Sequence, residues 1–241
     1  QLSRIDQLGR FVEKSNALKI MIDHHEHPGD YASITFSDTT KGSTCEMVYE
    51  LISHLDRDQI DEAIASCLYT GIMTDTGSFR FPSTTARTHQ VVSKLIENGA
   101  EPHLINQKIY DTNSIDRLRL LGTALKNLKK IDSTPVVYIT LSQKELNQNK
   151  FKKGDTEGFV NYGLSLKGIL LAVIMIENEV EKIIKMSFRS KGAFDVNKFA
   201  KKYFNGGGHI NAAGGMSSLT LDETVEQFIK IIEEEKSQFY G

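Results

Sequence analysis

Short apolar runs alternate with helical patterns through the first half of this 241-residue chain, and few folds accommodate that alternation. Residues 18–23 and 32–36 have the composition of buried strands, whereas 43–55 and 58–72 carry apolar residues at helical spacing. Strands separated by helices are typical of α/β folds whose strands lie parallel. We therefore expect an α/β domain with a mainly parallel sheet flanked by helices.

The pattern changes after Lys126. A lysine-rich segment leads into an apolar run at 136–141, and two further runs, 169–176 and 182–188, are separated by turn residues alone. Neighbouring strands of this kind pair antiparallel, so we expect a mixed sheet in a second, smaller α/β domain. The predicted division is a first domain over 1–125, a linker over 126–134 and a second domain over 135–241.

Composition excludes several classes of protein. The formal net charge is -2 at pH 7, far from the basic excess of a protein that binds long nucleic acids non-specifically. No apolar run approaches the ~18 residues of a membrane-spanning helix. Both cysteines, Cys45 and Cys67, fall in helical segments, so we expect no disulfide framework and predict a cytoplasmic location.

Asp23, His24 and His25 follow the first apolar run, at the end of a predicted strand, which is the usual functional edge of an open α/β sheet. Adjacent side chains on a strand point to opposite faces, so we predict that one histidine binds a metal and the other faces substrate. A further carboxylate, Asp75, follows a buried helix, and this set of donors suits Mn²⁺ or Mg²⁺. Taken singly, the histidines are equally well explained as a surface pair, and Asp75 is better explained as a turn residue.

Three consecutive glycines, residues 206–208, precede His209 and a run of small residues. Glycine amides allow phosphate oxygens to approach closely, and a helix beginning near His209 would add its N-terminal dipole. Arg189 ends a predicted strand and is suited to a bidentate contact with phosphate or a nucleobase. Each motif alone has a structural alternative: a flexible turn or tight packing for the glycines, and a solvated strand end for the arginine. Together they predict an anion-binding site.

Three strings of the sequence resemble one family. These are IDHH at 22–25, GIMTDTGSFRFPSTT at 71–85 and FRSKGAFDVNKFAKKYFNGGGHINAAGG at 188–215. They resemble the third and fourth motifs and the C-terminal signature of the DHH/DHHA1 phosphoesterases, and are most similar to the bacterial nanoRNase/pAp phosphatase group, also called RecJ-like or exopolyphosphatase-related. The resemblance implies a DHH domain that holds two Mn²⁺ ions, with Mg²⁺ as an alternative, and a DHHA1 domain that binds substrate across a cleft.

On the metal side, the resemblance implies that His24 and Asp75 are metal ligands and that His25 faces the substrate. Asp23 is expected to orient the imidazoles rather than to bind metal itself. The family's first motif, a histidine and two aspartates, and its second-motif aspartate are absent from this sequence, and residues 1–5 resemble the stretch just after that aspartate. We therefore expect the remaining ligands upstream of Gln1.

On the substrate side, the resemblance implies contacts from Arg189, His209, Gly207 and Gly208. The expected activity is hydrolysis of phosphoester bonds in short oligoribonucleotides or pAp. Hydrolysis of pyrophosphate, polyphosphate or cyclic dinucleotides is one alternative, because the same metal centre suits each. A non-catalytic nucleotide- or RNA-binding module is another. No membrane or long nucleic acid is an expected partner, and a homodimer stays open.

Overall fold

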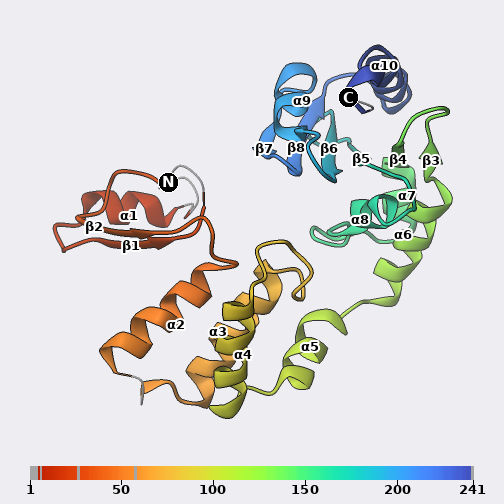
Figure 1. Ribbon diagram of the computed structural model, residues 1–241. Coiled ribbons are helices and arrows are strands. Elements are labelled where there is room, and N and C mark those ends of the chain that lie inside the picture. The colour runs from red at the N-terminus through yellow and green to blue at the C-terminus, as the bar shows by residue number, and fades with distance from the viewer. Residues whose placement is uncertain (1–4, 6, 26–27, 57–58, 240–241) are drawn as a thin grey trace. The chain divides into compact units, whose positions relative to one another are not determined.

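The computed structural model describes residues 5, 7–25, 28–56 and 59–239. Residues 1–4, which contribute to the predicted match just after the second motif, lie outside the described residues. The chain forms two compact units, Gln1–Thr112 and Asn113–Gly241 (Figure 1). We describe each unit by itself. Among the residues that the structure describes, every helix is too short or too polar to cross a lipid bilayer.

In its described residues, the first unit contains a parallel pair of strands and five α-helices. Strands β1 (Ile20–Asp23) and β2 (Ile34–Ser37) pair in parallel, with Ile20 opposite Ile34. This confirms the parallel sheet expected from the alternation of strands and helices. All four residues of β2 are exposed, so the prediction of a strand at 32–36 is confirmed but its predicted burial is wrong. The helices are α1 (Leu8–Lys14), α2 (Thr44–Leu55), α3 (Glu62–Asp75), α4 (Ala86–Glu97) and α5 (Pro102–Tyr110).

Side-chain caps mark where α2, α3 and α4 of the first unit begin. The hydroxyl of Ser43 accepts a hydrogen bond from the amide of Glu46 and starts α2, as its sequence pattern predicts. Helix α3 begins later than the predicted position 58, because the carboxylate of Asp61 accepts a hydrogen bond from the amide of Ile64. The caps orient apolar faces that pack together in one core, which includes Tyr49, Leu68, Ile72, Met73, Val91 and Leu95.

The second unit is built on a six-stranded sheet in the order β3-β4-β5-β6-β8-β7. Only β4 and β5 pair in parallel, so the sheet is mixed, as predicted. The strands are β3 (Lys129–Lys130), β4 (Val136–Leu141), β5 (Leu171–Asn178), β6 (Ile183–Ser190), β7 (Gly207–His209) and β8 (Ala212–Ser217). The helices are α6 (Ile115–Lys126), α7 (Gln143–Gln148), α8 (Phe159–Leu164), α9 (Val196–Tyr203) and α10 (Leu221–Glu234), followed by a 3₁₀ turn, η3 (Lys236–Phe239).

Successive side chains along this sheet pack alternately into two separate hydrophobic cores, one on each face. Val173 of β5 packs into a core with residues of α9 and α10, whereas its neighbours Ala172 and Ile174 pack into another with residues of α6, α7 and α8. Phe188, Phe199, Phe204 and Phe228 fill the first core. The unit therefore has helices on both faces of its sheet.

The division between the units lies earlier than the predicted linker at 126–134. Leu120 and Ala124 of α6 are fully buried in the same core as Val137 of β4, which ties α6 to the second unit. Lys129 and Lys130 form β3, whose side chains are exposed. The lysine-rich composition thus marks an exposed edge strand rather than a linker.

The glycine-rich segment forms a hairpin, so the prediction of a helix beginning near His209 is wrong. Strands β7 and β8 pair with Gly207 opposite Gly214 and His209 opposite Ala212. A Cβ atom added at Gly206 would lie 2.0 Å from the carbonyl oxygen of Gly214. Glycine is required there because two backbones approach closely.

Candidate functional site

The structure brings the two predicted metal ligands together in the first unit. His24 follows the end of β1 and Asp75 is the last residue of α3. The Nε2 atom of His24 lies 3.7 Å from Oδ2 of Asp75. Nδ1 of His24 is 3.2 Å from the carbonyl oxygen of Lys41. A proton on Nδ1 donated to that carbonyl leaves Nε2, on the side of Asp75, as the lone-pair nitrogen.

His25 has a different partner. Its Nδ1 atom lies 2.6 Å from Oδ1 of Asp23, and its backbone amide donates to the same oxygen at 3.1 Å. The contact fits the orienting task predicted for Asp23, which stays a prediction. The imidazole centroids of His24 and His25 are 4.6 Å apart, so the rings are neighbours and do not point to opposite faces. That expectation is wrong because both residues lie past the last residue of β1, where strand alternation no longer applies.

The loop that supplies the carbonyl for His24 is anchored by ion pairs. Lys41 Nζ donates to Glu50 Oε1 at 2.8 Å and lies 3.8 Å from Glu46 Oε1. Glu46 is buried, and the hydroxyl of Thr88 donates to its Oε2 at 2.9 Å. Burial alone would raise the pKa of Glu50, but hydrogen bonds from Lys41 and Arg87 outweigh it and lower that pKa. These contacts hold the loop against α2 and α4, a support that the sequence motifs do not reveal.

The donor chemistry at this site fits a divalent cation in part. An imidazole nitrogen and a carboxylate oxygen on facing elements are suitable ligands for Mn²⁺ or Mg²⁺. In the part of the chain that the structure describes, no group of three or more His, Cys, Asp or Glu side chains is placed to hold a metal ion. His24 and Asp75 stay predicted metal ligands, and by themselves they would supply two donors of a centre and not all of them.

In the second unit, strand register places two predicted substrate residues in one row. Arg189 of β6 lies opposite Ala212 of β8, and Ala212 lies opposite His209 of β7. Directly opposed residues of antiparallel strands project from the same face. Two strand spacings of ~4.8 Å put the backbones of Arg189 and His209 roughly 10 Å apart. The small side chain of Ala212 lies between them, so the row is open in its middle.

Arg189 is half-buried and keeps its charge. Burial lowers the pKa of its guanidinium, and the nearby carboxylate of Glu157 acts in the opposite direction. Arginine has so high a pKa that this shift leaves it protonated. Its Nη1 atom donates to the carbonyl of Phe188 at 2.9 Å, which orients the side chain. A fixed and partly desolvated cation is well suited to a phosphate group.

Two of the three glycine amides have acceptors outside the pairing of β7 with β8. The amide of Gly206 donates to the carbonyl of Ala200 at 3.1 Å. The amide of Gly208 donates to Oδ1 of Asn197 at 3.0 Å. The glycines thus serve the close approach of β7 to its neighbours, and the contacts predicted from Gly207 and Gly208 to substrate stay predictions. Asn197 was missed from the sequence, because no motif marks a contact between α9 and β7.

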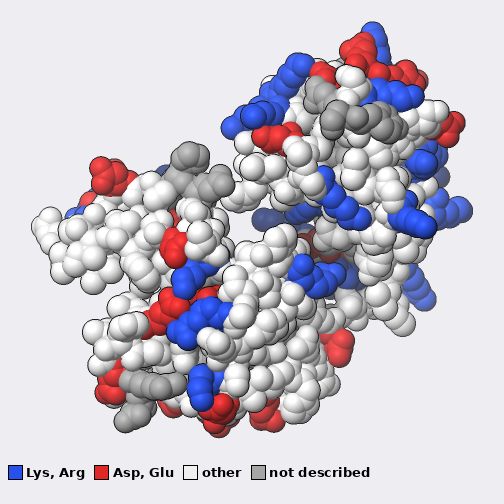
Figure 2. All heavy atoms as spheres, in the orientation of Figure 1, with Lys and Arg blue, Asp and Glu red and all other residues white. Residues whose placement is uncertain are grey.

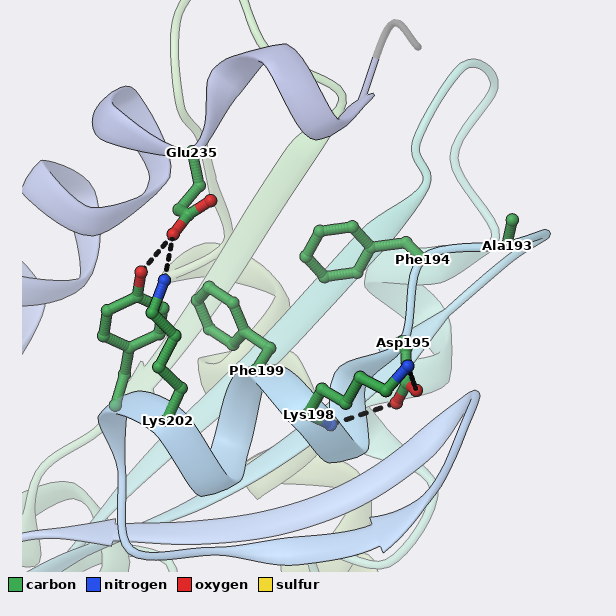
Figure 3. A pocket seen from close by; sticks show the side chains of 8 residues that line it. Ala193, Phe194, Asp195, Lys198, Phe199, Lys202 and Glu235 are labelled. Carbon is green, nitrogen blue, oxygen red and sulfur yellow. Dashed lines mark hydrogen bonds and ion pairs between the residues drawn. The ribbon is translucent and has the colours of Figure 1, made fainter.

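A cavity of about 390 Å³ lies beside α9 (Figure 3). Its aromatic wall includes Phe194 and Phe199. The charged groups of the cavity pair with one another: Lys202 Nζ donates to Glu235 at 2.8 Å, and Lys198 Nζ lies 3.6 Å from Asp195. None of the residues predicted to bind substrate or metal lines it.

Charge is divided unevenly between the units. The sequence holds 19 Lys and Arg against 15 Asp and Glu from Asn113 onward, and 10 against 16 before it. On the face shown in Figure 2, the basic side chains are spread over the second unit instead of forming one continuous patch.

Comparison with known proteins identifies relatives over most of the chain. The chain is 29% identical over 204 residues to the bifunctional oligoribonuclease and PAP phosphatase NrnA of Bacillus subtilis, covering 83% of this chain and 63% of that protein. It is 30% identical over 219 residues to the protein of the same name from Thermus thermophilus, covering 90% of this chain and 64% of that one. The chain thus spans somewhat less than two thirds of these relatives.

One solved structure has a higher sequence identity to the chain than these two relatives. An exopolyphosphatase-related protein from Bacteroides fragilis is 39% identical and superposes with a TM-score of 0.95, covering 100% of this chain and 71% of that chain. The DHH family N-terminal domain matches residues 3–72, and the DHHA1 domain matches residues 133–238. The matched segments contain His24 and His25 in the first case and Arg189 and His209 in the second. The chain therefore belongs to the DHH family, with a DHH domain followed by a DHHA1 domain.

Proposed function

We propose that the protein hydrolyses phosphoester bonds in short oligoribonucleotides or in pAp. One observation carries the proposal: the two donors suited to a divalent cation, His24 and Asp75, meet at 3.7 Å in the DHH unit. The proposal is supported by the relatives named oligoribonuclease and PAP phosphatase.

In this proposal, His24 and Asp75 would supply two of the donors that hold Mn²⁺ or Mg²⁺. When bound, such ions neutralise and polarise the phosphoryl group. His25, held by Asp23, is close enough to His24 to meet the same substrate, since the rings are 4.6 Å apart. We assign it to the phosphoryl oxygens or the leaving group.

The DHHA1 unit binds the nucleotide in this proposal. Arg189 supplies a fixed positive charge and His209 an exposed imidazole on the same sheet face. Ala212 leaves room between them for a phosphate or a flat ring. A ligand with both a phosphate and a nucleoside uses all three positions. Inorganic pyrophosphate lacks the nucleoside and uses only part of the row.

A substrate panel tests the assignment. The kcat/KM of the protein with Mn²⁺ is compared for pAp, di- to pentaribonucleotides, long RNA, pyrophosphate, polyphosphate and a cyclic dinucleotide. We expect the short oligonucleotides or pAp to be hydrolysed fastest. A clear preference for polyphosphate or pyrophosphate would overturn the assignment and favour the activity suggested by the exopolyphosphatase-related neighbour.

The same panel separates an enzyme from a binding module. A module that only binds nucleotides would show affinity for pAp in calorimetry without turnover at any Mn²⁺ concentration. A homodimer and a cytoplasmic location stay predictions from the sequence, and gel filtration tests the first of them.

A further inference from the structure

Strand β7 is an edge strand of three residues, and α9 holds its outer side. Two backbone hydrogen bonds flank it: the amide of Gly206 donates to Ala200 at 3.1 Å, and the amide of Val196 donates to the carbonyl of Ile210 at 2.8 Å. The strand's middle residue, Gly208, donates to a side chain instead, Oδ1 of Asn197 at 3.0 Å. Of these three bonds, only the last can be removed by changing a side chain.

The two stripes of α9 face different surroundings. Asn197 faces β7 through its bond to Gly208, and an added Cβ atom at Gly207 would lie 3.5 Å from the side chain of Lys201, one turn further along. The neighbouring stripe, Lys198 and Lys202, lines the cavity of Figure 3 and pairs with carboxylates there. Asn197 therefore serves the hairpin and not the cavity.

The backbone at Gly208 has little freedom of position. Its φ of +158° is close to extended, but an added Cβ atom would lie 2.4 Å from the carbonyl oxygen of Ala212. Gly208 is thus pressed against β8 on one side and bonded to Asn197 on the other. His209 is the next residue, so the direction of its side chain follows from how Gly208 is held.

We propose that Asn197 is a positioning residue, which holds β7 through Gly208 so that His209 stays in the row with Arg189. This inference rests on the proposed function, because the row is the site that we assign to the nucleotide. Asn197 acts through His209 and does not itself contact substrate. No sequence motif or relative's name assigns it this task.

Amide hydrogen exchange tests the contact without any substrate. In Asn197→Ala we expect the amide of Gly208 to exchange at least 10-fold faster than in the unaltered protein, because its acceptor is gone. Asn197→Asp keeps an oxygen at the same place and should restore protection. Asn149→Ala is the matched control, since Asn149 bonds a backbone carbonyl of α7, that of Glu145, at 2.8 Å in the same unit. Unchanged exchange at Gly208 in Asn197→Ala overturns the inference.

A double-mutant comparison with His209→Ala tests the consequence for pAp. Asn197→Ala should raise KM about 5-fold or more with a smaller change in kcat, and should add less than 2-fold in a protein that already carries His209→Ala. A multiplicative loss in the double variant would mean that Asn197 acts by another route, and the inference fails.

If His209→Ala itself leaves KM unchanged, the proposed nucleotide site fails and the positioning task falls with it. If His209→Ala raises KM and Asn197→Ala does not, the inference alone fails. Circular dichroism and the Tm of each variant show that the fold is retained.

Discussion

The two units build their candidate sites in different ways. In the DHH unit, His24 follows the end of β1, Asp75 is the last residue of α3, and the carbonyl of Lys41 orients the histidine. In the DHHA1 unit, Arg189 and His209 lie in one row of continuous antiparallel strands. The first site depends on how separate elements pack, whereas the second depends on strand register. The ends of a strand and a helix that meet can bring two donors within bonding distance of one ion. A row of residues across adjacent strands can instead present a longer surface to a ligand.

The largest expected effect on activity comes from removing the side chain of His24 or of Asp75. His24→Ala and Asp75→Ala should each lower Mn²⁺ affinity and kcat together, by on the order of 10²-fold or more, because each removes one of the two donors that the structure brings together. His25→Ala should lower kcat and leave metal affinity nearly unchanged, since His25 pairs with Asp23. Isothermal titration with Mn²⁺ and turnover of pAp check this. Equal loss of metal in all three variants would show that the division between the histidines is wrong.

Substitution of a residue in the row formed by Arg189, Ala212 and His209 should chiefly change KM. Arg189→Ala should raise KM for pAp by the equivalent of about 1.5–3 kcal/mol, the range for a charge-assisted hydrogen bond, and leave Mn²⁺ affinity unchanged. Lys185→Ala is the control, because Lys185 is an exposed cation of the same strand whose ammonium pairs with Glu181 at 2.6 Å. An equal rise in KM for both variants would mean that the overall positive charge of the unit attracts the substrate, and that Arg189 makes no specific contact with it.

The register that makes the row depends on close backbone approach. Gly206→Ala should destabilise the second unit by about 1–3 kcal/mol, because its Cβ atom would collide with the backbone of Gly214. Gly214→Ala should change stability by less than about 0.5 kcal/mol, since its nearest neighbour, the carbonyl oxygen of Met186, is 3.8 Å away. Urea unfolding of both variants gives the difference. If both variants lose similar stability, close backbone packing in the hairpin does not explain why glycine occupies position 206.

The smallest effect concerns the loop under His24. The pKa of Glu50 is lowered in the folded protein, because hydrogen bonds from Lys41 and Arg87 outweigh its burial. Its contribution is therefore complete above the ordinary carboxyl pKa of about 4.3 and is lost as pH falls through the lower folded value. Glu50→Gln should thus lower the Tm at pH 7 more than at pH 3, by an amount that corresponds to less than about 1 kcal/mol. A Tm difference that does not depend on pH would exclude this linkage.

Local patterns in the sequence were sufficient for much of the fold. Helical spacing and the cap at Ser43 predicted α2, and the paired apolar runs predicted β5 and β6 with a mixed sheet. These predictions succeed because periodicity and capping involve residues close together in the chain. The motifs around His24 and Asp75 also indicated residues that the structure brings together.

The glycine-rich segment shows where local patterns are insufficient. Glycines and alanines have no side-chain periodicity, so GGGHINAAGG is compatible with a helix start or with a hairpin. The backbone contact of Gly206 with Gly214 and the pairing of β8 with β6 decide for the hairpin. The pairing of β8 with β6 links segments that are distant in the chain, and its energy is absent from any short window of sequence.

The sequence by itself determined the family, the α/β class and the identity of the candidate donors, because each depends on residue types at short spacing. Tertiary structure alone decided that His24 faces Asp75 while His25 faces Asp23, and that the division between the units lies before α6. It also decided that the side chain of Asn197 accepts a hydrogen bond from the amide of Gly208, the residue before His209. Each of these depends on which surfaces pack together, and packing is settled by the burial of side chains contributed by the whole unit.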